Sequence, residues 1–134
     1  MTNKTVLVVS AHAADFVWRA GGAIALHEKR GYDVTVVCLS FGERGESAKL
    51  WKLGDTTLEK VKMARRKEAE AAAKALDVHD IQFFDLGDYP LDLGKKSQIK
   101  FVDVIRKVQP TFMMSHSFWD PYNTDHMNTT RFVL

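Results

Sequence analysis

Four short apolar runs alternate with three stretches of helical periodicity, and this alternation is the feature that most constrains the fold. The apolar runs cover residues 6–10, 33–39, 81–84 and 111–115, and the helical stretches cover 15–30, 56–76 and 101–108. The first run is apolar on both of its alternating faces, as in a central strand that is covered on both sides. Strands that alternate with helices favour a parallel sheet joined by right-handed crossovers. We therefore predict an α/β fold with a doubly wound, mainly parallel sheet and helices on both faces.

A capping-box pattern marks the start of the second helical stretch. Thr56 is followed three residues later by Glu59, so that each side chain can bond the backbone N–H of the other residue. We thus predict a helix that begins directly after Thr56 and continues to about Leu76.

The size and charge of the chain exclude several classes of protein. With 134 residues, 46% of them hydrophobic and 27% charged, the chain has the composition of an ordinary globular domain. We expect residues 1–134 to form a single domain. A net charge of +2 gives no electrostatic footprint for nucleic acid or for a membrane surface, so neither is an expected partner.

The cysteine content and the N-terminal residues bear on location. Cys38 has no second cysteine to pair with, which excludes an internal disulfide and favours a reducing compartment. The residues before the first apolar run are too few for a signal peptide or a membrane span. We expect a cytoplasmic protein. We also expect a homo-oligomer, although no motif fixes the number of subunits.

Polar side chains gather after each of the four predicted strands. In an open α/β sheet the carboxyl ends of the strands share one edge, and ligands bind there. The residues concerned are, in chain order, His12, Asp15, Glu43, Glu46, Asp85, Asp88, His116, Asp120, Asp125 and His126. The opposite ends of the strands carry only ordinary turn residues. We therefore expect one functional site, at the carboxyl edge of the sheet.

Two histidines and a carboxylate in this set favour a metal site. His12, Asp15 and His126 would hold one divalent cation and leave a coordination position open, which is the catalytic rather than the structural pattern for zinc. Zn²⁺ is the expected cofactor, and iron, cobalt or manganese also suit such ligands. The alternative interpretation is that Asp15 only caps the first helix and that His12 fills a turn.

Four motifs resemble those of the LmbE/PIG-L family. They are Ala-His-x-x-Asp at residues 11–15, Gly-Glu-x-Gly-Glu at 42–46, Arg65-x-x-Glu68 in the following helix and Asp125-His126 after the fourth strand. The resemblance implies a Rossmann-like fold and, in most members, zinc-dependent N-deacetylation of sugar derivatives. It also implies that the zinc ligands are His12, Asp15 and His126. Members of the family continue well past the last motif, so we expect this chain to be the N-terminal part of a longer one.

Two positions depart from the deacetylase pattern. Ala14 stands where the deacetylases have the aspartate that serves as general base, and Asn123 stands where they have a histidine that assists at the oxyanion. Each group is worth roughly 10²–10⁴ in rate, so deacetylation should be badly impaired. The strings at 11–22 and 42–51 resemble more closely the branch of the family that hydrates 4-oxalomesaconate. This compound is an unsaturated oxo-tricarboxylate of bacterial gallate and protocatechuate degradation.

The chemistry of hydration assigns roles to the remaining residues. Adding water to a conjugated alkene needs a Lewis acid for the developing enolate, a base that activates water and an acid that delivers a proton. Glu46 is the expected base, with Glu43 as the second choice; the alternative is a loop carboxylate paired with Arg44. The expected substrate-binding residues are Arg19, Arg44, Arg65, Asp88 and Asn123. We expect the proton donor to lie beyond Leu134.

Three functions therefore remain open. The first is zinc-dependent hydration of a carboxylated oxo-acid, and the second is zinc-dependent N-deacetylation of an amino-sugar derivative. The third is a metal-binding or ligand-binding fragment without turnover. Ala14 and Asn123 favour the first function over the second, and a small-molecule carboxylate is accordingly the expected partner.

Overall fold

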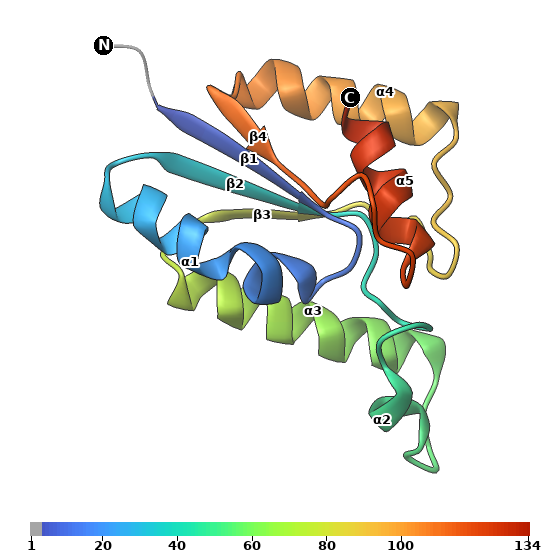
Figure 1. Ribbon diagram of the computed structural model, residues 1–134. Helices are drawn as coiled ribbons and strands as arrows, with labels where there is room; N and C mark the ends of the chain where they lie inside the picture. The colour runs from blue at the N-terminus through green and yellow to red at the C-terminus, as the bar shows by residue number, and fades with distance from the viewer. Residues whose placement is uncertain (1–3) are drawn as a thin grey trace.

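The computed structural model describes residues 4–134 as a four-stranded parallel sheet with helices on both faces (Figure 1). The strands are β1 (Thr5–Ser10), β2 (Asp33–Cys38), β3 (Asp80–Phe83) and β4 (Phe112–Met114). The helices are α1 (Asp15–Lys29), α2 (Ala48–Trp51), α3 (Leu58–Ala75), α4 (Lys95–Val108) and α5 (Thr124–Val133). The strands lie in the order β3-β2-β1-β4, and each neighbouring pair is parallel. The predicted α/β fold is confirmed.

The central strand is β1, because it forms ladders along both of its edges. It pairs with β2 over six residues and with β4 over three. Val6 and Val8 point into one hydrophobic cluster, whereas Leu7 and Val9 point into a second cluster on the other side of the sheet. Apolar residues on both alternations are therefore the direct consequence of burial on two faces.

The two faces of the sheet are covered by different helices. α1 and α3 pack on the first face, where Phe16, Ile24 and Ala73 join the cluster around Val6. α4 and α5 pack on the second face, where Phe101 and residues near the end of α5 join the other cluster (Figure 1). This is the doubly wound arrangement that the alternation of strands and helices predicts.

The direction of the crossovers reverses at β1. α1 leads from β1 to β2, and α3 leads from β2 to β3, so both move toward the same edge of the sheet. α4 then returns the chain past β2 and β1 to place β4 on the opposite side. The segments that leave β1 and β4 consequently run to helices on opposite faces. Such a switch point opens a crevice at the carboxyl ends of the strands.

The start of α3 differs from the sequence prediction by one residue. The N-cap is Thr57, whose hydroxyl accepts the backbone N–H of Lys60 at 3.3 Å. The hydroxyl of Thr56 instead donates to the carbonyl of Leu50 at 2.9 Å. The prediction that Thr56 caps the helix is wrong, because Thr56 is engaged by the end of the preceding short helix α2.

The sequence analysis did not anticipate α5. This helix starts after Asn123, whose side-chain oxygen accepts the backbone N–H groups of Asp125 at 3.1 Å and His126 at 3.4 Å. Two buried threonines, Thr129 and Thr130, follow in the second turn. Their hydroxyls bond to backbone carbonyls, which lets polar residues occupy the buried face of this helix.

Within residues 4–134, no helix is both long enough and apolar enough to cross a membrane. Among the described helices α3 is the longest at 18 residues, and its exposed face carries charged side chains such as Arg66, Lys67 and Glu70.

Replacing Thr57 by alanine should lower the free energy of unfolding by about 1 kcal/mol, because an N–H in the first turn of α3 loses its acceptor. Thr57→Ser keeps the hydroxyl and is the matched control. Urea unfolding followed by circular dichroism measures both variants. Equal stability of Thr57→Ala and the unsubstituted protein would contradict the assignment of the cap.

Candidate metal centre

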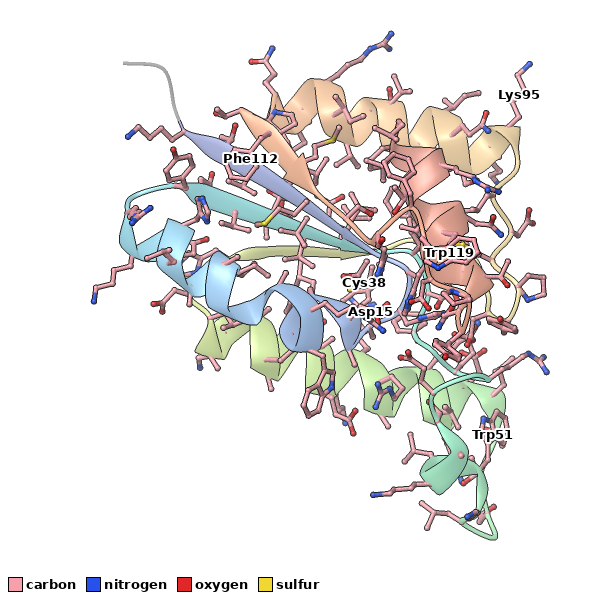
Figure 2. The ribbon with its side chains drawn as sticks, in the orientation of Figure 1. Asp15, Cys38, Trp51, Lys95, Phe112 and Trp119 are labelled. Carbon is pink, nitrogen blue, oxygen red and sulfur yellow. The ribbon has the colours of Figure 1, made fainter. Side chains whose placement is uncertain are left out.

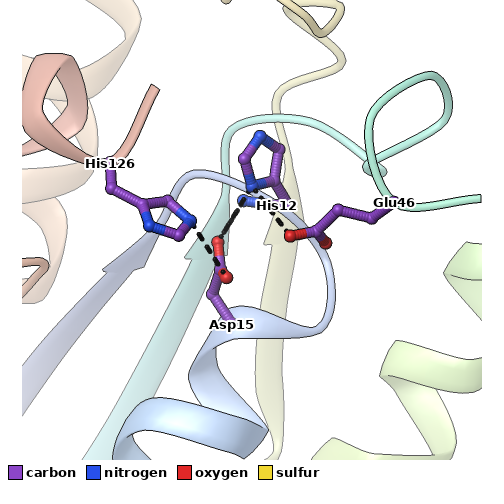
Figure 3. A group of neighbouring side chains, drawn as sticks. All are labelled: His12, Asp15, Glu46 and His126. Carbon is purple, nitrogen blue, oxygen red and sulfur yellow. Dashed lines mark hydrogen bonds and ion pairs between the residues drawn. The ribbon is translucent and has the colours of Figure 1, made fainter. Parts of the chain in front are cut away.

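Four side chains from separate segments meet where the central strand ends. His12 lies in the turn after β1, Asp15 begins α1, Glu46 belongs to the loop after β2, and His126 lies in the first turn of α5. Each offers a nitrogen or oxygen atom, and these atoms all lie within 4.8 Å of one another (Figure 3). The predicted ligands His12, Asp15 and His126 are thus brought together at the crevice between β1 and β4, and Glu46 joins them.

The Asp15 carboxylate occupies the middle of this group. Its Oδ2 atom lies 3.2 Å from Nδ1 of His12, and its Oδ1 atom lies 3.3 Å from Nε2 of His126. Glu46 approaches from the other side, with Oε1 3.4 Å from Nδ1 of His12. Both imidazoles are about 1% exposed, yet neither of these two ring nitrogens makes a hydrogen bond. Buried nitrogens without a partner are costly unless something else binds them.

The other nitrogen of each ring is held by a carboxylate. Nε2 of His12 lies 3.2 Å from Oδ2 of Asp125, and Nδ1 of His126 lies 2.8 Å from Oδ2 of Asp120. An imidazole that donates its N–H to a carboxylate turns the lone pair of its second nitrogen toward the opposite side. The two lone pairs then converge on Asp15, so the donor set fits a divalent cation with nitrogen and oxygen ligands.

The electrostatics of the group favour positive charge at its centre. Burial lowers the pKa of His12, but the carboxylates of Asp15 and Glu46 outweigh this effect and raise the pKa to about 11. Burial raises the pKa of Asp15, but the adjacent histidines outweigh this effect and hold the pKa below its usual range. The pKa of His126 is raised by Asp15 and Asp120 against the effect of burial. A divalent cation that displaces protons from the imidazoles would supply this positive charge.

A third histidine, His116, packs against this group but is not positively charged. The ring of His116 stacks on that of His126, with centroids 4.1 Å apart and an angle of 3° between the planes. Burial lowers its pKa to about 4, and its Nε2 accepts the backbone N–H of Ala11 at 3.0 Å. His116 is therefore a neutral ring that backs His126. The sequence analysis placed it at this edge but assigned it no role.

Two open clefts border Asp15, and Arg19 lines both. The first has a volume of about 560 Å³ and is lined by Ala14, Asp15, Trp18, Arg19, Glu46 and Arg65. The second, of about 510 Å³, lies along β1 and β4 and includes His116 and Trp119 in its wall. Figure 2 shows Asp15 and Trp119 at the end of the sheet where the strands finish, with Phe112 at the other end. Arg19 and Arg65 therefore lie beside the candidate metal-binding group, and their contact with a substrate stays a prediction.

The other predicted binding residues take different positions. The Arg44 side chain is exposed on the loop after β2. The Asp88 carboxylate is buried and accepts the backbone N–H groups of Arg44 at 2.9 Å and Gly45 at 2.8 Å. The Asn123 side chain caps α5 through the N–H groups of the first turn. Asp88 and Asn123 thus hold the backbone around the group, whereas their predicted contact with a substrate stays a prediction.

The fold and this group together define a class: a doubly wound α/β domain with a histidine–carboxylate set, suited to a divalent cation, at its switch point. The chain belongs to the PIG-L family, described as GlcNAc-PI de-N-acetylase, whose model matches residues 7–134.

The relatives that this chain matches are named either as a hydratase or as deacetylases. The chain is 63% identical to the 4-oxalmesaconate hydratase of Pseudomonas putida over 123 residues, which are 92% of this chain and 47% of the relative. It is 26% identical over 126 residues to a probable N-acetyl-alpha-D-glucosaminyl L-malate deacetylase 2 of Bacillus subtilis, with 90% of this chain and 55% of the relative covered. The chain therefore spans about half the length of the curated relatives it matches.

The similar solved structures also include both a hydratase and a deacetylase. The crystal structure of GalB, the 4-carboxy-2-hydroxymuconate hydratase of Pseudomonas putida, is similar with a TM-score of 0.94 and 59% identity, over 97% of this chain and 54% of GalB. The N,N'-diacetylchitobiose deacetylase from Pyrococcus horikoshii is similar with a TM-score of 0.86 and 27% identity, over 98% of this chain and 48% of that protein.

Replacing His126 by alanine should remove most of the divalent cation that the protein binds, because one of the converging nitrogens is lost. His27→Ala is the matched control, since the His27 ring lies in α1 and its Nδ1 atom bonds to the carbonyl of Ala23. Metal analysis after equilibration with zinc and removal of the unbound ion measures the content per chain. An undiminished content in His126→Ala would contradict the assignment of this ligand.

Proposed function

We propose that this protein is a zinc-dependent hydratase that adds water to an unsaturated oxo-tricarboxylate of the 4-oxalomesaconate kind in bacterial degradation of aromatic acids. One observation carries the proposal: the Glu46 carboxylate lies 3.4 Å from His12, while residue 14, which precedes Asp15, is alanine and offers no base. The identity of 63% to the Pseudomonas putida hydratase supports the same choice.

The cation would be held by His12, Asp15 and His126. Their fit rests on the two buried ring nitrogens without hydrogen bonds and on the carboxylate between them. When bound there, zinc supplies a Lewis acid that stabilises the negative charge developing on the oxo group of the substrate. The partners Asp125 and Asp120 keep both rings oriented toward that position.

Glu46 acts as the base in this proposal. Its side chain is 29% exposed, so one carboxylate oxygen can face the cleft while Oε1 faces His12. The carboxylate takes a proton from water as the water oxygen bonds to one carbon of the double bond. The other carbon takes a proton from solvent, and Glu46 returns its proton to solvent, so that one water is added overall. Glu43 was the second choice as base, but its side chain is buried behind the loop.

Arg19 and Arg65 are the proposed partners of the substrate carboxylates. Both line the cleft that contains Ala14 and Glu46. The Nε atom of Arg65 is buried and makes no hydrogen bond, although its Nη1 atom bonds Glu68 at 2.7 Å. A guanidinium group that lines the cleft is suited to a carboxylate ligand because its planar set of donors matches the two carboxylate oxygens.

Deacetylation of an amino-sugar derivative is the alternative, and it rests on the family as a whole and on the Bacillus subtilis relative. It would require a base at position 14 and an electrophilic helper at position 123. Alanine cannot act as a base, and the oxygen of the Asn123 side chain already accepts two N–H groups of α5. Both facts favour the hydratase.

Glu46→Gln should lower kcat for hydration by roughly 10²–10⁴ and change KM little, because the amide keeps the size of the side chain but cannot take the proton. Kinetics with 4-oxalomesaconate, followed by absorbance, measure the effect. Glu59→Gln, an exposed position in the first turn of α3, is the control.

A second variant separates the two functions. Ala14→Asp restores the base of the deacetylase pattern, and in a hydratase it should not rescue Glu46→Gln. A rise in KM without a fall in kcat for Glu46→Gln would contradict its role as base and make it a binding residue. Deacetylation without any hydration by the unsubstituted protein would overturn the proposed function.

A further inference from the structure

Two buried carboxyl groups join the loop that carries Glu46 to a neighbouring loop. Glu43 belongs to the loop at residues 42–47, and Asp88 belongs to the loop at residues 84–94, between β3 and α4. Their exposed fractions are 2% and 4%, respectively. We call Glu43 and Asp88 the carboxyl clamp.

Asp88 makes the backbone contacts of the clamp. One of its oxygens accepts the N–H of Arg44 at 2.9 Å, and the other accepts the N–H of Gly45 at 2.8 Å. A β-carbon at position 45 would lie 3.3 Å from Asp88, so glycine permits this close approach. Asp88 therefore holds the backbone of the 42–47 loop through both of its carboxylate oxygens.

Glu43 holds the proton of the clamp. Its Oε2 atom accepts the N–H of Phe41 at 3.2 Å, and burial together with the neighbouring Asp88 carboxyl group raises its pKa. Two buried carboxyl groups in contact cannot both be ionised at low cost, and Asp88 already accepts two N–H groups. Of the two groups, Glu43 is therefore the one that favours the neutral form.

The charged groups around Glu43 agree with this assignment. Asp88 faces it from the 84–94 loop, and Lys62 faces it from α3. Burial and Asp88 raise the pKa of Glu43 to about 7, and Lys62 opposes this only in part. Lys62 is itself engaged, with its Nζ 2.8 Å from Asp85.

The 84–94 loop also reaches the histidines of the metal-binding group. The N–H of Leu91 donates to Oδ1 of Asp125 at 3.0 Å, and Oδ2 of the same carboxylate lies 3.2 Å from Nε2 of His12. The loop therefore contacts the Glu46 segment through Asp88 and the His12 ring through Asp125. A displacement of this loop would move the proposed base relative to the proposed ligands.

We propose that the carboxyl clamp positions Glu46 for catalysis, with Glu43 as the protonated donor and Asp88 as the ionised acceptor that fixes the 42–47 loop. The inference rests on the proposed function of the same site. It assigns Glu43 and Asp88 as positioning residues rather than as a second base and a substrate ligand. Loss of the shared proton places two negative charges in contact and loosens the loop, so turnover falls as the pH rises above about 7.

Substitutions at Glu43 test the proton. Glu43→Ala removes the donor and should lower kcat roughly 10- to 10²-fold with little change in KM, because Glu46 is displaced from its position. Glu43→Gln keeps a donor to Asp88 and should restore most of this loss. It should also lack the fall in kcat above about pH 7 that the unsubstituted protein shows. Glu70→Ala is the control, since Glu70 pairs with Arg66 on the surface of α3.

Several outcomes would overturn the inference. If Glu43→Gln is as inactive as Glu43→Ala, Glu43 acts as a base and not as a donor. If Glu43→Gln retains the fall in kcat at high pH, the shared proton does not control the loop. Asp88→Asn offers one oxygen for two N–H groups, so full activity of this variant would also contradict the clamp.

A measurement without turnover separates the clamp from the proposed function. Carbon-13 NMR of protein labelled at glutamate carboxyl groups should show one signal that titrates near pH 7 and disappears in Glu43→Gln. Titration of Glu43 near pH 4.5 would overturn the clamp and leave the hydratase proposal standing. Absence of hydration by the unsubstituted protein would instead overturn the proposed function and, with it, the positioning role.

Discussion

The negative charge of Asp15 is the constraint on which the arrangement of the site depends. One oxygen of this carboxylate accepts the backbone N–H of His12 at 2.8 Å, which closes the turn between β1 and α1. The same group lies within 3.3 Å of ring nitrogens of His12 and His126, which belong to segments over a hundred residues apart. A buried carboxylate is stable only with such partners. Asp15 therefore fixes the turn and draws the start of α5 to the end of the central strand.

Much of this arrangement follows from the sequence because strand polarity is a strong constraint. Once β1 is recognised as a strand buried on two faces, the residues after each parallel strand must share an edge, and His12, Asp15 and His126 fall there. The helix α5 could not be predicted in the same way. Its buried face carries Thr129 and Thr130 instead of an apolar stripe, and hydroxyl bonds to backbone carbonyls make that burial possible.

Which carboxylate of the 42–47 loop faces the site is also beyond the reach of sequence patterns. Glu43 and Glu46 lie in the same glycine-containing segment, and no periodicity distinguishes them. The tertiary contacts decide: Asp88 accepts the backbone N–H groups of Arg44 and Gly45, Glu43 is buried, and Glu46 is directed to His12. Asp88 likewise shows the pattern of a possible ligand in sequence, but its hydrogen bonds are those of an acceptor for the backbone.

The position of the proposed base determines which contacts must hold it in place. A base at position 14 would sit in the turn that β1, Asp15 and α1 already hold rigid. A base at position 46 sits on a loop whose position depends on contacts from elsewhere, including Asp88 and the hydroxyl of Ser47, which donates to the carbonyl of Gly42 at 2.8 Å. Catalytic groups lose rate steeply when misplaced, so a base on a loop requires an anchor of comparable rigidity. With alanine at position 14, the contacts of Asp88 with the 42–47 loop are the anchor that the proposed base at position 46 requires.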